Sequence, residues 1–238
     1  MIRFSIIFIS AMMGATAHTE TADQFFERIT GPTLNQSRFA YNAKCRRFIR
    51  DDGRLGEYGT LVVHYLQNVE GAKTCMIDGG IRMDVPDRGS IVSNSCPNYE
   101  RFSRNERMHF WVWVFTAIAA VESSCDVNAD TQGVNGIADG LFQLEHNRHW
   151  RSEANRDPLH CAPGMAVDTK NVHFQVACSI SILRDTACGR NLAKIGDKSL
   201  VNRNQYWQEL KSSNREISQR IAAYPKCSAP TSYFATNN

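Results

Sequence analysis

The 238-residue sequence lacks several patterns that identify common classes of protein. It contains no GxGxxG, GxxxxGKS or GxxxxGKT sequence, so neither a dinucleotide-binding turn nor a P-loop is predicted. The formal net charge of +3 is too close to neutral to indicate a nucleic acid partner. The cysteines form no CxxC pair and no zinc-ribbon spacing. We therefore expect no nucleic acid partner, no metal and no cofactor.

Long hydrophobic runs are also missing, since no segment reaches the ~18 consecutive apolar residues that a membrane span needs. The chain does begin with Arg3, an apolar stretch over 4–14 and the small residues "ATA" at 15–17. This pattern predicts a signal peptide over 1–17 that is removed after Ala17. All eight cysteines follow it, and an even number in an exported chain favours disulfide bonds. We expect a secreted or periplasmic monomer whose disulfide pairing the sequence leaves open.

Helical periodicity dominates the remaining sequence. Apolar residues recur at three-to-four spacing in "TADQFFERI", "SRFAYNAKCRRFIR" and "EYGTLVVHYLQNV", all between 20 and 70. Residues 71–100 are rich in Gly, Asp, Ser and Pro, which predicts an irregular connection fastened by Cys75 and Cys96. We therefore expect an N-terminal helical and irregular extension over 18–100, a main domain over 101–227 and a tail over 228–238.

The clearest single element is a helix over 104–123. "SRNE" at 103–106 is a capping box, with Ser103 as the N-cap and Glu106 three residues later. Apolar residues on all sides of the helix predict that it is buried at the centre of a domain. Glu122 lies at its end, where desolvation and the helix dipole both favour a protonated carboxyl. Glu122 could then donate a proton, although a solvated glutamate beyond the last core turn is the alternative.

The segments that follow complete a mostly α fold of the α+β class. Glycine, aspartate and asparagine in 126–145 predict a long turn and a short β-hairpin, with "GLFQL" as one strand. Helices are predicted again over 166–187, 204–211 and 215–224, the last one stopped by Pro225.

The segment "AVESSCDVNADTQGVNGIADGLFQLE", 120–145, resembles the central region of the lysozyme-like glycosidases, specifically the soluble lytic transglycosylase and goose-type lysozyme group. In that group an apolar helix ends in Glu-Ser, a polar loop follows, and a Gly-Leu-x-Gln strand crosses the cleft. Here Glu122 and Ser123 match the first element, and "GLFQ" matches the second after the spacing that the group shows. The resemblance covers about 104–145, extends more weakly over 166–185, and does not include 18–100.

The resemblance implies a lysozyme-like fold with the hairpin at the cleft, and a muramidase that cleaves the β-1,4 bond between N-acetylmuramic acid and N-acetylglucosamine. Glu122 would be the general acid, and Ser123 would contact the sugar beside it. Gln143 would bind a sugar N-acetyl or hydroxyl group, and Gly140 would let the backbone approach the glycan. The group's Ala-Tyr-Asn-Ala-Gly stretch is absent, and Tyr206 in "QYWQEL" is our candidate for its aromatic residue.

Glu145 bears on the mechanism because it lies two residues after Gln143. Alternation along a strand would place both side chains on one face. Goose-type lysozymes carry an aspartate at the matching place, whereas lytic transglycosylases typically lack a carboxylate there. If the face lines the cleft, Glu122 and Glu145 flank the bond, and an inverting hydrolase needs them about 6.5–9.5 Å apart. We therefore expect hydrolysis by water, with a solvent-facing Glu145 as the alternative.

Other functions remain open at this stage. A lytic transglycosylase would form 1,6-anhydro products, and a non-catalytic protein of the same fold would only bind peptidoglycan. A de-N-acetylated glycan is a further possible substrate, because acidic residues at 126, 130, 139 and 145 accompany the site.

Two metal-like patterns are incomplete. "DVNAD" begins like an EF-hand loop, but Thr131 and Ile137 replace the required glycine and glutamate. His146 and His149 occur without an HExxH sequence. Peptidoglycan glycan strands are thus the only partner that we expect.

Overall fold

The computed structural model describes residues 21–69, 71–78, 96–133, 136–145, 168–187, 207 and 216–227. These residues form a mostly helical structure with one small antiparallel sheet, as the sequence predicts. The helices are α1 Ala22–Glu27, α2 Glu57–Asn68, α3 Arg104–Ser123, α6 Val172–Ala187 and α7 Glu216–Ala222, and the strands are β1 Asp130–Gly133, β2 Gly136–Asp139 and β3 Leu144–Glu145. Shorter helical turns are Leu34–Gln36, Ala43–Arg47, Lys73–Ile77, Tyr99–Arg101 and Pro225–Cys227.

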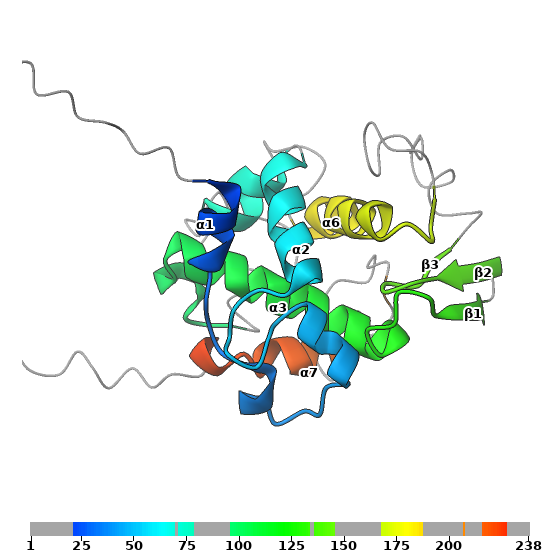
Figure 1. The fold of residues 1–238 in the computed structure, drawn as a ribbon, viewed down its shortest axis with the longest axis horizontal. Helices are drawn as coiled ribbons and strands as arrows, with labels where there is room; N and C mark the ends of the chain where they lie inside the picture. Colours follow the sequence, from blue (N-terminus) through cyan, green and yellow to red (C-terminus); the bar gives the residue numbers. More distant parts are fainter. Residues whose placement is uncertain are drawn as a thin grey trace, which may run out of the picture.

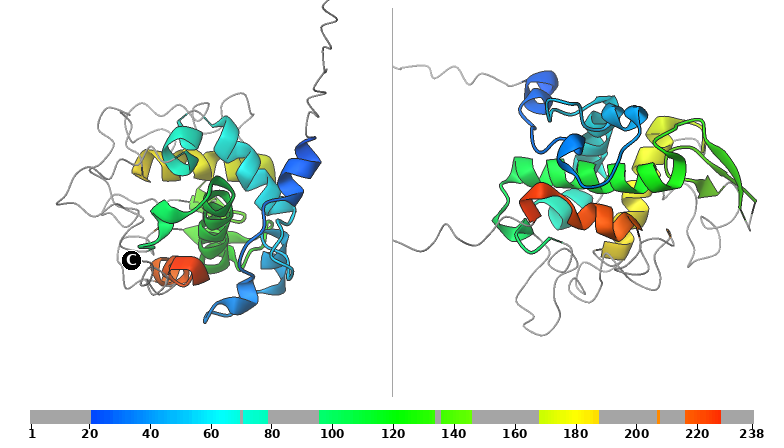
Figure 2. Two further views of the ribbon diagram at one scale, coloured as in Figure 1. Left: turned by 90° about the vertical axis from the view of Figure 1, so that its left-hand side faces the viewer. Right: turned by 90° about the horizontal axis from the view of Figure 1, so that it is seen from below.

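The central element is α3, which runs through the middle of the molecule (Figure 1). Helices α2 and α6 lie on one side of it and α7 lies on the other (Figures 1 and 2). Every residue from Met108 to Ala119 is buried, in agreement with the predicted all-round apolar surface. The capping box also forms, since Ser103 N donates to Glu106 Oε2 at 2.7 Å and Glu106 N donates to Ser103 Oγ at 3.3 Å.

The sheet has the order β1-β2-β3 and projects beyond the C-terminal end of α3 (Figure 1). Its register pairs Asp130 with Asp139 and Ala138 with Glu145. The prediction of a strand over "GLFQL" is wrong for its first four residues, which form a turn. Gly140 and Gln143 have φ values of +71° and +48°, and extended backbone does not allow such values.

The N-terminal part contains less helix than its periodicity predicts. Helices α1 and α2 are present, but the predicted helix over 37–50 reduces to the 3-10 turn Ala43–Arg47. Asn42 caps this turn by accepting a hydrogen bond from Lys44 N at 2.9 Å. The side chains of this part still enter the common hydrophobic core, where the ring of Phe48 lies 6.3 Å from that of Phe142.

Disulfide bonds join distant parts of the chain. Cys45 is bonded to Cys125, directly after α3, and Cys96 is bonded to Cys227 near the end of the described chain. A Cys75–Cys96 bond across the 71–100 connection is therefore excluded. None of the cysteines in the described ranges is free, which is typical of proteins from oxidising compartments.

Three sequence predictions are not tested by the described residues. The signal peptide over 1–17 and the tail over 228–238 lie outside the described residues, and the domain boundary near residue 100 stays a prediction. Within the described ranges, no helix is both long enough and apolar enough to cross a membrane.

Candidate active site

Glu122 lies in the last turn of α3 and is half-buried. The helix ends directly after it, because Ser124 and Cys125 adopt left-handed backbone with φ values of +55° and +61°. Cys125 N donates to Ala119 O at 2.9 Å, and its side chain is bonded to Cys45. The predicted position of Glu122 at the end of a buried helix is thus confirmed, and the backbone around it is fixed from both sides.

Ser123 connects the end of α3 to the turn formed by residues 140–143. Its hydroxyl lies 3.0 Å from Ala119 O, within the helix, and 2.9 Å from Leu141 O, within the turn. The sequence led us to expect that Ser123 contacts a sugar, but its hydroxyl donates within the protein. The consequence is that the turn lies against the helix end that carries Glu122.

The turn is held by its own residues as well. Gln143 is buried, and its amide nitrogen donates to Gly140 O at 3.0 Å and to Ala129 O at 3.1 Å. Gly140 N also donates to Ala129 O, at 2.7 Å. An amide NH2 group has two hydrogens, so these two acceptors use the full donor capacity of the nitrogen. Gln143 was predicted to bind a sugar, and in this structure its nitrogen stabilises the turn.

A side chain from α6 completes the support of the turn. Gln175 is fully buried, and its Oε1 accepts from Leu141 N at 2.8 Å while its Nε2 donates to Thr169 O at 2.9 Å. A Cβ atom at Gly140 would lie 2.1 Å from Gln175 Nε2, so only glycine fits here. We expected Gly140 to admit a glycan, but the neighbour that requires glycine is the Gln175 amide.

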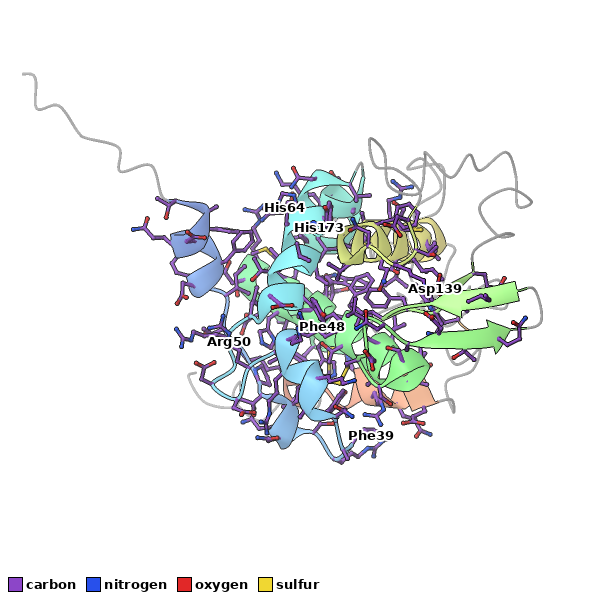
Figure 3. The ribbon with its side chains drawn as sticks, turned by 45° about the vertical axis from the view of Figure 1, so that its right-hand side comes forward. Phe39, Phe48, Arg50, His64, Asp139 and His173 are labelled. Atoms are coloured by element: carbon purple, nitrogen blue, oxygen red, sulfur yellow. A yellow bond between two sulfur atoms is a disulfide. The ribbon has the colours of Figure 1, made fainter. Side chains whose placement is uncertain are left out.

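Two further contacts join the segment before α6 and the C-terminal part to the region of the 140–143 turn. Thr169 Oγ1 donates to Asp139 Oδ2 at 2.6 Å, and both side chains are buried where β2 approaches α6 (Figure 3). Trp207 is buried and its Nε1 donates to Phe142 O at 2.9 Å. The sequence reasoning missed the roles of Gln175 and Thr169, because no local motif marks a contact between segments thirty or more residues apart.

Glu145 is half-buried in β3, opposite Ala138. The prediction that it shares a strand face with Gln143 is wrong, because Gln143 belongs to the turn and alternation applies only within a strand. The proposed role of Glu145 near the cleaved bond therefore no longer has the support of a strand face shared with Gln143. Tyr206 lies outside the described residues.

Lysines from other elements balance acidic side chains near the site. Lys44 Nζ contacts Asp126 Oδ2, and this hydrogen bond is the main reason that the pKa of Asp126 lies below its usual value. Lys170 Nζ lies 3.2 Å from Asp130 Oδ2. The acidic surplus that the sequence indicates is thus smaller in the folded chain. Among the described residues, no three Cys, His, Asp or Glu side chains gather as a metal site requires, and the two histidines at 146 and 149 lie outside these residues.

Comparison with known proteins gives little information on function. No family model and no curated protein matches this sequence. Solved structures that match include the wild-type form of Bd0314 DslA, with 19% identity, a TM-score of 0.48, and coverage of 75% of this chain and 93% of that chain. A glutamate-to-glutamine variant of DslA has the same identity and TM-score and covers 80% of this chain and 100% of its own. At such values the likeness carries no conclusion about activity.

Proposed function

We propose that this chain cleaves the glycan strands of peptidoglycan, with Glu122 as the general acid. The observation that supports this most is the position of Glu122, half-buried in the last turn of a helix that is buried over Met108–Ala119 and beside the hydrogen-bonded turn 140–143. The partial exposure of Glu122 leaves its carboxyl accessible to a substrate, as a general acid requires. The lysozyme-like resemblance of 104–145 supplies the substrate class.

In this proposal Glu122 protonates the glycosidic oxygen between N-acetylmuramic acid and N-acetylglucosamine as that bond breaks. Ser123, Gln143 and Gly140 act as positioning residues, because their contacts fix the 140–143 turn beside the acid. Tyr206 remains our candidate for an aromatic contact to the sugar.

Two nucleophiles could attack the anomeric carbon as the bond breaks, giving two fates for the muramic acid residue that the products distinguish. Attack by water, assisted by Glu145, would give a reducing end, as in a lysozyme. Attack by the 6-hydroxyl of the muramic acid itself, with its proton passing to the Glu122 carboxylate, would give a 1,6-anhydro end, as in a lytic transglycosylase. The loss of the alternation argument for Glu145 makes the second fate a candidate of equal standing.

The test is digestion of purified sacculi by the mature protein and by Glu122→Gln, with mass spectrometry of the released fragments. Exposed Glu100 precedes α3, at the end of that helix distant from Glu122, so Glu100→Gln is the matched control. We expect Glu122→Gln to lose about 100-fold or more in rate, since general acid catalysis contributes about 10²–10⁴-fold. Glu100→Gln should cut like the parent, and both variants should melt at the parent temperature.

Native and chemically de-N-acetylated sacculi should be compared in parallel, because the substrate's acetylation is not fixed by the sequence. Cleavage of either one that depends on Glu122 supports the proposal, and the fragment masses identify the mechanism. Binding to sacculi without release of fragments would instead assign a non-catalytic role. Equal cleavage by the parent and Glu122→Gln would show that another group is the acid.

A further inference from the structure

A second concave site lies far from Glu122. A cavity of about 200 Å³ opens between α1 and the segment that leads into α2. Figure 1 shows α1 at the opposite end of α3 from the sheet, and Figure 3 shows Arg50, one of the lining residues, well away from Asp139. The cavity therefore cannot be a subsite for the sugars next to Glu122.

One wall of this cavity is a closed group of charges. Arg54 Nη1 lies 3.0 Å from Glu27 Oε2, and Arg54 Nε lies 2.7 Å from Asp52 Oδ2. Asp52 also accepts a hydrogen bond from Arg54 N at 3.0 Å, which fixes the loop that carries the guanidinium. Arg54 is thus shared between Glu27 and Asp52, and the groups of this wall already bind one another, so they do not select a ligand.

The other two charged lining residues are Arg50 and Asp23. Within the described part of the chain, both side chains are exposed and neither makes an ion pair or a side-chain hydrogen bond, and the charge of Arg50 contributes to the lowered pKa of nearby Asp52. Together with Arg54 and Glu27 they bring the charge of the lining to zero. One available cation and one available anion in a neutral cavity match a ligand that carries both charges itself.

The size and the apolar lining narrow the ligand further. Phe26 and Leu55 supply apolar surface between the charged groups. A cavity of about 200 Å³ is smaller than the ~300–1,000 Å³ of sites for drug-sized ligands, so it suits a small molecule. Alanine has this size and carries an ammonium, a carboxylate and a methyl group.

We propose that this cavity binds an α-amino carboxylate with a small apolar side chain. Arg50 pairs with the carboxylate, Asp23 pairs with the ammonium, and Phe26 and Leu55 contact the side chain. Binding at this site requires no glycosidase activity, so its test is independent of the test of the proposed function. The ligand is either a free amino acid or an α-amino carboxylate centre carried on a peptide.

The test is titration of the ¹⁵N-labelled chain, followed by amide chemical shifts, with alanine, propionate and ethylamine as separate probes. Alanine should bind about tenfold more tightly than either single-charge probe, and the shifted amides should belong to α1 and residues 50–60. S-methylglutathione is a peptide whose γ-glutamyl group keeps an α-amino carboxylate, so it distinguishes the two sources. Tighter binding of this peptide than of alanine indicates a peptide-borne ligand. Weaker binding indicates a free amino acid.

Two variants assign the charges. Arg50→Gln should weaken alanine and propionate about tenfold each, whereas Asp23→Asn should weaken alanine about tenfold and leave propionate unchanged or tighter. The matched control is Arg46→Gln, since exposed Arg46 pairs with Asp51 at 3.0 Å outside the cavity. Equal affinity for alanine and propionate, shifts outside the cavity, or unchanged binding in Arg50→Gln would each overturn the proposal.

Discussion

The contact between Gly140 and Gln175 makes a quantitative prediction about the stability of the turn beside Glu122. In Gly140→Ala, the new Cβ would lie 2.1 Å from Gln175 Nε2, so the buried amide must move. Its movement breaks the 2.8 Å bond to Leu141 N and the 2.9 Å bond to Thr169 O. Each buried partner left without a hydrogen bond costs about 1–3 kcal/mol.

Alanine at a φ of +71° adds about 1–2 kcal/mol of backbone strain, so Gly140→Ala should lower the free energy of unfolding by about 5–6 kcal/mol. Gln175→Ala alone removes the same two hydrogen bonds and should cost about 4 kcal/mol. In the double variant the clash is absent and the hydrogen bonds are already lost. Its cost should therefore be about 5–6 kcal/mol, which is about 4 kcal/mol less than the sum of the single effects.

The assay is urea denaturation of the four proteins with their disulfides intact, analysed as a double-mutant cycle. Gly136→Ala is the matched control, because Gly136 also has a positive φ, +128°, but no atom lies within 4 Å of its Cβ position. Its effect should add to that of Gln175→Ala within about 0.5 kcal/mol. Additive effects of Gly140→Ala and Gln175→Ala would refute the reasoning. If Gly140→Ala alone fails to fold and the double variant folds, that result also shows the predicted coupling.

Three further measurements test other parts of the fold. Burial lowers the pKa of His109 to about 4, so the unfolded chain binds a proton here from pH ~6.5 downward and the folded chain only near pH 4. The free energy of unfolding should therefore fall by about 3 kcal/mol as the pH decreases from ~6.5 to about 4. His109→Gln should abolish this fall in urea titrations. Trp207→Phe leaves the buried Phe142 carbonyl without its donor and should cost about 1–3 kcal/mol in the same assay; no change would mean that water replaces the indole. Replacing Cys45 and Cys125 together by alanine removes a disulfide between residues 80 positions apart and should lower the free energy of unfolding by about 4 kcal/mol, seen as a lower melting temperature. An unchanged melting temperature would contradict the anchoring role of this disulfide.

The sequence predicts the start and the burial of α3 because the signals for both are local. Ser103 and Glu106 specify the start through their own hydrogen bonds, and the continuous apolar surface requires a central position whatever its neighbours are. The end of the helix is less directly encoded, since Ser124 and Cys125 adopt left-handed backbone without a glycine. A disulfide to Cys45 holds that geometry, and the pairing of cysteines is not written in local sequence.

The turn after β2 shows where local reasoning fails. "GLFQL" has the apolar content of a strand, and three of its members, Leu141, Phe142 and Leu144, are fully buried. Leu141 and Phe142 are buried inside a turn, because hydrogen bonds with Ser123, Gln175 and Trp207 satisfy its backbone in the core. Those partners lie before the turn, in α6 and in the C-terminal part, so no window around the turn contains them.

This arrangement changes how a loss of activity in Ser123 variants should be interpreted. The resemblance assigns Ser123 to the sugar, whereas the structure places its hydroxyl 2.9 Å from Leu141 O. If it only contacts the sugar, Ser123→Ala should raise KM and leave the free energy of unfolding unchanged. If it holds the turn, Ser123→Ala should lower kcat together with stability, by about 1–2 kcal/mol, since the buried Leu141 carbonyl loses a donor. Ser123→Thr keeps the hydroxyl and should restore both kcat and stability in the second case, because only the donor to Leu141 matters there.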